Sequence, residues 1–128
     1  MQLEDVLNLW KKDCVIDELN LDSATIKCAM MHSTYLELLS LAKLRLRKRT
    51  SEFAIMEKDK WLYYAGKMTK DDMDKRGWVY DPFAGNTKPL KSDMDKYLRA
   101  DTDIMKAMQL IDYQKIIVET LDEIMTTI

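Results

Sequence analysis

The feature that most constrains this chain is a long run of residues without a helix breaker. From Asp13 to Ala65 the sequence contains neither proline nor glycine, and Leu, Ala, Met, Lys, Glu and Arg, which are good helix formers, dominate it. Polar residues near position 20 can cap the start of a helix, and Gly66 is a natural place for it to end. The run therefore predicts one long helix over residues 23–66.

Shorter elements are predicted on both sides of this helix. Residues 1–22 predict an N-terminal helix and a connector, with Leu3, Val6, Leu7 and Trp10 on one side of the helix. Residues 76–92 hold both prolines and two of the three glycines, so they predict a loop, with at most a short strand arm at WVY. Residues 93–128 predict C-terminal helices, of which the last opens at Asp101 or Thr102. Together these segments predict one mostly α domain over residues 1–128, with no second domain.

The last predicted helix carries an apolar stripe wider than one neighbouring helix would cover. Its apolar side chains alternate at spacings of three and four, and a second apolar row lies beside them. An ordinary core helix explains part of this pattern. The width nevertheless favours a homo-oligomer, because 128 residues with few helices offer little other surface to cover the stripe. The side chains predicted to join subunits are Leu110, Ile117, Leu121, Ile124 and Ile128.

Several function classes find no support in the sequence. Two cysteines and one histidine are too few for a disulfide framework or a structural zinc site, and Cys28 and His32, four residues apart, are more simply packing residues. No nucleophile triad, Gly-rich phosphate loop or paired-carboxylate signature is present, so the sequence predicts a protein that is not an enzyme and needs no metal or cofactor. The N-terminus lacks a secretory signal and no apolar run reaches about 20 residues, which predicts a cytoplasmic protein.

Charge is unevenly distributed along the chain. The net charge is −2, yet residues 23–70 carry ten basic and four acidic groups. The densest part is KLRLRKR, with five cations in seven residues: Lys43, Arg45, Arg47, Lys48 and Arg49. An acidic protein thus has a basic middle, and a polyanion is one partner that this segment would suit.

The stretch KDKWLYYAGK adds aromatic rings to the positive charge. On a helix, positions eleven apart lie within roughly 20° of each other, so Arg47 aligns with Lys58 and Arg49 with Lys60. Cations attract phosphates, and bases stack on aromatic rings, which is the pattern of single-strand binding. The stretch therefore predicts a DNA-binding surface that adds Lys58, Lys60, Trp61, Tyr63 and Tyr64 to the five cations of KLRLRKR.

A second interpretation of the same stretch remains open. A solvated helix face with i,i+4 salt bridges, snorkelling lysines and buried aromatic rings explains much of it. In that case the protein is a helical oligomeric scaffold that binds only proteins. The two interpretations differ in one test: exchanging Lys58 and Lys60 for alanine should leave the fold intact and weaken DNA binding only if the surface binds DNA.

Four stretches of the sequence resemble those of a known protein family. MQLEDVLNLWKKDCVID, the Tyr35-Leu36 region with Lys43 and Arg47, KDKWLYYAG and LRADTDIMKAMQLIDY resemble the UvsY family, the recombination mediators of T-even-type bacteriophages. The family motif reads Lys-x-Arg-x-x-Tyr-Tyr-x-Gly, and its two cations bind DNA. Here the arginine position is occupied by Lys60, which keeps the charge but loses the bidentate reach of a guanidinium. The loop from Trp78 to Pro89 is also longer and more aromatic than the family pattern.

The resemblance implies a function beyond what the residues alone predict. It implies a mediator without catalytic activity that binds single-stranded DNA and helps a phage recombinase replace the phage single-strand-binding protein, in recombination, recombination-dependent replication and repair. It further implies a ring of six or seven subunits, with seven favoured, joined through C-terminal helices, and a location in the cytoplasm of the host cell. The mostly α fold with a long central helix agrees with this expectation.

Overall fold

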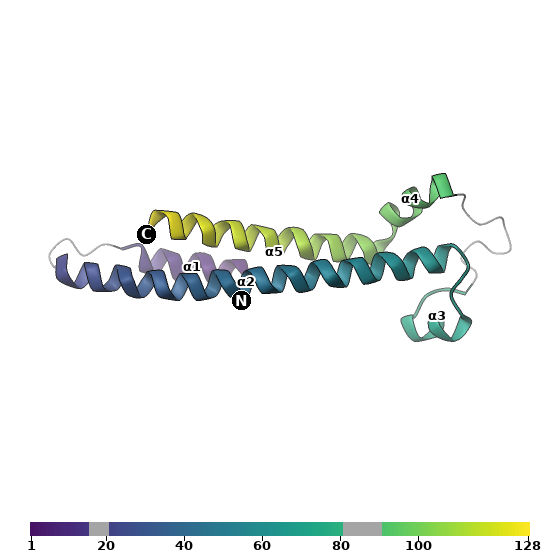
Figure 1. Ribbon diagram of the computed structural model, residues 1–128, viewed down its shortest axis with the longest axis horizontal. Helices are drawn as coiled ribbons and strands as arrows, with labels where there is room; N and C mark the ends of the chain where they lie inside the picture. Colours follow the sequence, from purple (N-terminus) through teal and green to yellow (C-terminus); the bar gives the residue numbers. More distant parts are fainter. Residues whose placement is uncertain (16–20, 81–90) are drawn as a thin grey trace. The chain divides into compact units, whose positions relative to one another are not determined.

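A computed structural model describes the backbone of residues 1–15, 21–80 and 91–128 (Figure 1). These residues form five helices and no strand: α1 (Leu3–Asp13), α2 (Leu21–Tyr64), α3 (Lys70–Arg76), α4 (Lys91–Ala100) and α5 (Thr102–Thr127). The predicted mostly α fold with a long central helix and a C-terminal helix is confirmed. The described part of WVY forms no strand. None of the helices among the described residues is long and apolar enough to cross a membrane.

The described chain divides into two compact units. Unit 1 comprises Met1–Lys48 with Ile111–Ile128, and unit 2 comprises Arg49–Leu110. Both α2 and α5 contribute residues to each unit. The prediction of a single domain over residues 1–128 is not tested by this division and stays a prediction.

The core of unit 1 is built from α1, α2 and α5. Its buried side chains recur at helical spacings on α2 and α5 and include one residue of α1, which puts an apolar stripe of each helix toward the others. They are Val6, Tyr35, Leu39, Ala42, Ile117, Leu121 and Ile124. Each fully buried Leu, Ile or Val contributes about 1.5–3 kcal/mol relative to an exposed one. Apolar burial is therefore what holds the three helices of unit 1 together.

Polar contacts at the edge of this core fix the position of α1. The ring of Trp10 meets the ring of Tyr35 edge-on, with centroids 5.8 Å apart, and the Tyr35 hydroxyl donates to Asp13 Oδ2 at 3.1 Å. Burial, followed by the hydrogen bond and the charge of Asp13, raises the pKa of Tyr35 well above its ordinary range. Of the apolar residues predicted on one side of this helix, Leu3, Val6 and Trp10 join the core, whereas Leu7 is exposed.

Two glycines end helices in unit 2 in the same way. At the end of α2, Lys67 N donates to Leu62 O and Gly66 N to Tyr63 O, and Gly66 has a φ of 73°. At the end of α3, Trp78 N donates to Met73 O and Gly77 N to Asp74 O, and Gly77 also has a φ of 73°. Both are Schellman motifs, in which a residue in the left-handed region satisfies the last carbonyls. The predicted end of the long helix at Gly66 is thus close to the observed end at Tyr64.

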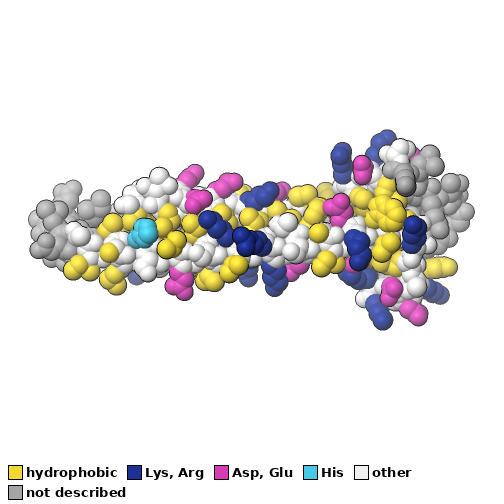
Figure 2. All heavy atoms as spheres, viewed as in Figure 1, with side chains coloured by type: hydrophobic (Ala, Val, Ile, Leu, Met, Phe, Trp, Pro, Cys, Tyr) yellow, Lys and Arg dark blue, Asp and Glu magenta, His cyan; other side chains and the backbone are white. Residues whose placement is uncertain are grey.

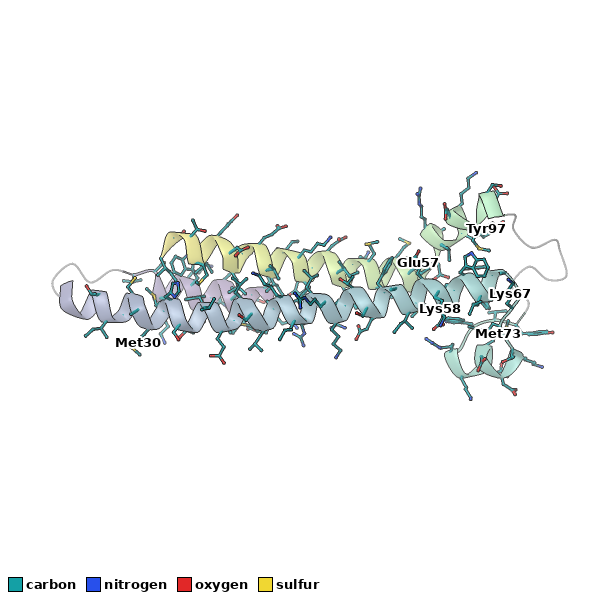
Figure 3. All side chains as sticks on the ribbon, in the orientation of Figure 1. Met30, Glu57, Lys58, Lys67, Met73 and Tyr97 are labelled. Atoms are coloured by element: carbon teal, nitrogen blue, oxygen red, sulfur yellow. The ribbon has the colours of Figure 1, made fainter. Side chains whose placement is uncertain are left out.

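Helix α3 was not predicted, although its local signals are present in the sequence. The Thr69 side chain accepts a hydrogen bond from Asp72 N, acidic residues fill the first turn, and Lys75 and Arg76 fill the last. These are the start and stop signals of a helix. Figure 3 shows Met73 pointing from α3 toward the end of α2, and its side chain is buried. A seven-residue helix with one buried side chain leaves no periodicity to read, which is why α3 was missed.

Candidate nucleic-acid interface

The basic stretch of residues 43–49 lies on α2 within unit 1, apart from its last residue. Lys43, Arg45, Arg47 and Lys48 are exposed. Among the described residues, Lys43, Arg45 and Arg47 form no ion pair. Figure 2 shows Lys and Arg side chains gathered over the middle of α2. The described chain therefore holds three solvated cations within five residues of one helix, available to an external anion.

The other predicted cations of α2 differ sharply in exposure. Arg49 is half-buried and pairs with Glu52, with Nη1 3.2 Å from Oε2. Lys58 is exposed and lies on the side of α2 away from α5 (Figure 3). Lys60 is only 5% exposed. Of the two pairs predicted to align eleven residues apart, Arg47 with Lys58 consists of exposed residues, whereas Arg49 with Lys60 does not.

Lys60 is the centre of a buried ionic cluster in unit 2. Its Nζ lies 3.2 Å from Asp101 Oδ2 and 3.0 Å from Asp103 Oδ2, and it stands 3.9 Å from the centroid of the Trp78 ring. The Trp78 indole Nε1 in turn donates to Asp103 Oδ2 at 3.1 Å. A buried ammonium group is retained where carboxylates and an aromatic face replace its water. In this arrangement Lys60 binds carboxylates of its own chain.

The two carboxylate oxygens of Asp101 have different partners in the same cluster. Its Oδ1 accepts from the backbone N–H groups of Asp103 at 2.9 Å and Ile104 at 3.1 Å, so it is the N-cap of α5 and one of the two helix starts that the sequence predicted. Its Oδ2 accepts from the Tyr64 hydroxyl at 2.5 Å and from Lys60. Burial raises the pKa of Asp101, but the hydrogen bonds from Tyr64, Ile104 N–H and Lys60 outweigh it, so the pKa lies below its ordinary value.

The two tyrosines of KDKWLYYAGK also point into unit 2. Tyr63 is buried, and its hydroxyl donates to Val79 O at 2.6 Å. Tyr64 is half-buried, and its ring stands 5.1 Å from that of Tyr63 and 6.0 Å from that of Tyr97. Burial is the first cause that raises the pKa of both hydroxyls, and Asp101 adds to it. The buried ring of Tyr63 presents no open face of the kind that a base needs, and the ring of Tyr64 is partly covered.

Trp61 takes an intermediate position. It is half-buried, packs against the cluster of Met94, Leu98 and Ile104, and has Lys67 Nζ 5.0 Å from its ring centroid. Figure 3 shows Lys67 at the end of α2. Contact of Lys60, Trp61, Tyr63 and Tyr64 with DNA stays a prediction. In the described arrangement Lys60, Trp61 and Tyr64 contact residues of α4 or α5, and Tyr63 contacts Trp78 and Val79.

Comparison with known families identifies the chain. The family model "Recombination, repair and ssDNA binding protein UvsY" matches residues 9–128, which is nearly the whole chain. The chain belongs to the UvsY family. Comparison with curated proteins and with solved structures gives no match. The resemblance stated from the sequence is confirmed, and membership makes this a protein of recombination, repair and single-stranded DNA binding rather than a member of an enzyme class.

In this UvsY-family chain most of the residues predicted to join subunits are buried or half-buried within their own chain. Ile117, Leu121 and Ile124 are buried against α1 and α2 of the same chain, and Ile128 is half-buried. Leu110 is 44% exposed. The short helix α1 and the long helix α2 cover Ile117, Leu121 and Ile124 within the same chain, while Leu110 remains exposed. A role of these residues in joining subunits stays a prediction.

Sequence patterns missed the residues that pair with Lys60 in this UvsY-family chain. Asp103 and Trp78 lie far from Lys60 in the sequence, and Asp101 was predicted only as a helix start. A DTD triplet before a helix signals a cap, but no local spacing reveals a lysine that lies some forty residues earlier.

The described residues contain no group of three His, Cys, Asp or Glu side chains that could hold a metal ion.

Proposed function

We propose that this protein is a recombination mediator, which binds single-stranded DNA and helps load a recombinase onto strands covered by a single-strand-binding protein. Its family supplies the coarser part of this function, which is recombination, repair and single-stranded DNA binding. The recombinase, the single-strand-binding protein and the phage setting come from the resemblance and belong to the proposal.

The observation that carries the proposal is the set of solvated cations on α2. Lys43, Arg45 and Arg47 are exposed and form no ion pair among the described residues, so a phosphate would replace only water. Lys58 adds a further exposed cation in unit 2. Phosphate contacts dominate single-strand affinity and depend little on base sequence. We propose these four cations as the first contacts of the strand.

The role proposed for Lys60 follows from its partners. As long as it pairs with Asp101 and Asp103, a phosphate must compete with two carboxylates for it. A direct contact of Lys60 or of the buried Tyr63 with DNA therefore requires unit 2 to open, whereas the half-buried Trp61 and Tyr64 are proposed as contacts through their exposed parts. Lys48 and Arg49 complete the proposed set as cations that flank the first contacts.

We further propose that the protein works as a ring of itself, with seven subunits favoured over six. A weak basic surface repeated around a ring binds one strand at several points, and avidity then exceeds the affinity of a single site. Exposed apolar side chains are present on α2 and α5 for contact with other copies, among them Leu36, Leu41, Leu44, Leu110 and Ile116. The same exposed residues favour the alternative, a helical scaffold that binds only proteins.

Two variants that each remove two positive charges test the proposal. Lys43→Ala/Arg47→Ala removes two of the proposed contacts, and Lys11→Ala/Lys12→Ala removes two exposed lysines from α1 as a matched control. Binding of a labelled strand of ~30 nucleotides, a length that covers several sites of usual size, is followed by fluorescence anisotropy over a series of salt concentrations. The account expects salt-sensitive binding that weakens in the first variant only. Equal weakening in both would show a general charge effect and not a site.

Mediator activity is tested separately from DNA binding. A recombinase filament is assembled on a strand already covered by single-strand-binding protein, with and without this protein. The proposal expects faster assembly with the wild-type protein and a smaller gain with Lys43→Ala/Arg47→Ala. A gain that is independent of DNA binding would support the protein-only scaffold.

A further inference from the structure

The segment that follows α3 is held to unit 2 at three points. Gly77 closes the end of α3, with Trp78 N donating to Met73 O at 2.9 Å. The Trp78 indole donates to Asp103, and its ring lies 5.2 Å from that of Tyr63. Val79 O accepts from the Tyr63 hydroxyl at 2.6 Å. The backbone that leads to Tyr80 is thus tied to α2 and α5.

The two residues that end this anchored segment face solvent. Val79 is 71% exposed and Tyr80 is 60% exposed, directly beside the buried Tyr63 and the half-buried Trp78. Lys70 Nζ lies 5.4 Å from the centroid of the Tyr80 ring. Figure 2 shows hydrophobic side chains among Lys and Arg at this end of α2 and around α3. An anchored backbone that presents an aromatic ring with a cation beside it has the elements of a stacking contact.

We propose that Tyr80 and Lys70 form a base-stacking contact for single-stranded nucleic acid in unit 2. This inference rests on the proposed DNA binding and adds a contact that the basic cations of α2 do not supply. A base stacks on an aromatic ring independently of its identity, because every base has a π-face. The bases of a duplex are already stacked on each other, so the contact selects single strands.

The charges around Tyr80 predict how the contact depends on salt. Exposed Lys67, Lys70 and Lys75 lie in or next to α3, together with exposed Asp71, Asp72 and Asp74. The acidic residues offset the lysines, so this contact gains its affinity from the ring and not from net charge. Removing the ring should therefore lower affinity without changing the slope of affinity against salt.

The test compares a strand with bases and a strand without them. Wild-type protein, Tyr80→Ala, Tyr80→Phe and the neighbouring control Val79→Ala are titrated against labelled 30-nucleotide oligo-dT and against an abasic strand of the same length. One lost stack weakens binding to oligo-dT about 5-fold or more. The inference expects that loss in Tyr80→Ala alone, and equal affinities of all four proteins for the abasic strand.

The other outcomes overturn the inference in distinguishable ways. If Tyr80→Ala binds oligo-dT as tightly as the wild-type protein, the proposed stacking contact is refuted. The same conclusion holds if this variant loses binding to a protein partner while its binding to oligo-dT is unchanged. Equal losses on both strands would mean that Tyr80 acts through charge or fold. Wild-type protein that binds neither strand would refute the proposed function itself. Photocrosslinking of a strand that carries 5-iodouracil provides a second measurement: the inference expects the crosslink at Tyr80, and its absence there contradicts it.

Discussion

Exchanging Lys60 for methionine should destabilise unit 2 strongly. Methionine retains an unbranched apolar stem and removes the charge that pairs with Asp101 and Asp103. Removing one partner of a buried ion pair costs about 3–5 kcal/mol, because the other charge is left without compensation.

The structure places the expected cost at the lower end of that range. Asp101 keeps three donors after the exchange, namely the Tyr64 hydroxyl and the N–H groups of Asp103 and Ile104. The side chain of Asp103 is 37% exposed, so water can replace the lysine there. We expect a loss of about 3 kcal/mol in the free energy of unfolding, which corresponds to a fall of about 10 °C in Tm for a chain of this size.

The assay is urea or thermal unfolding at one fixed protein concentration, followed by tryptophan fluorescence and circular dichroism. Lys58→Met is the matched control, since Lys58 is exposed and its exchange should change the free energy of unfolding by no more than about 0.5 kcal/mol. If Lys60→Met proves as stable as Lys58→Met, the buried cluster does not hold unit 2 and the reasoning is refuted. The joint exchange of both lysines for alanine, which the sequence predicted to leave the fold intact, should be replaced by these separate variants.

Three further predictions follow from single contacts. The stabilising effect of Asp101 is present above its ordinary pKa of 3.8 and is lost as the pH falls through its lowered folded-state pKa. The thermal midpoint of the wild-type protein should therefore fall more steeply in acid than that of Asp101→Asn. Parallel curves of thermal midpoint against pH would contradict this. Leu121→Ala empties a fully buried site in unit 1 and should lower the free energy of unfolding in urea by about 2–5 kcal/mol, and a loss under 1 kcal/mol would mean that the site is not packed as described. Gly77→Ala meets no described atom within 4 Å, so its cost should be only the ~1–2 kcal/mol of the left-handed conformation, with Gly77→Asn costing less in the same assay.

The sequence predicted those parts of the fold that leave a long or local signal. The run without glycine or proline predicted α2 to within two residues at each end, and Asp101 was identified as a possible helix start. Exposure was harder to predict, because it depends on contacts between distant residues. Lys58 and Lys60 look equivalent in the sequence, yet one is solvated and the other is surrounded by Asp101, Asp103 and Trp78.

The oligomerisation stripe shows the same limit of sequence patterns. Periodicity identified Ile117, Leu121 and Ile124 as side chains that must be buried, and they are. It does not specify whether the covering helix comes from the same chain. In unit 1 that cover is provided by α1 and α2, which meet α5 around Val6, Tyr35 and Leu39.

The central claim is that exposed cations of α2 bind the phosphates of single-stranded DNA. The most direct measurement is the slope of log affinity against log salt concentration for wild-type protein and for Lys43→Ala/Arg47→Ala, with a 30-nucleotide strand. Each phosphate contact adds about 0.7 to the magnitude of this slope for a single strand. Because the variant lacks two contacts, the account predicts that the magnitude of its slope is smaller than that of the wild-type protein by about 1.4 for each subunit that binds the strand. An unchanged slope, with DNA binding intact, would contradict it.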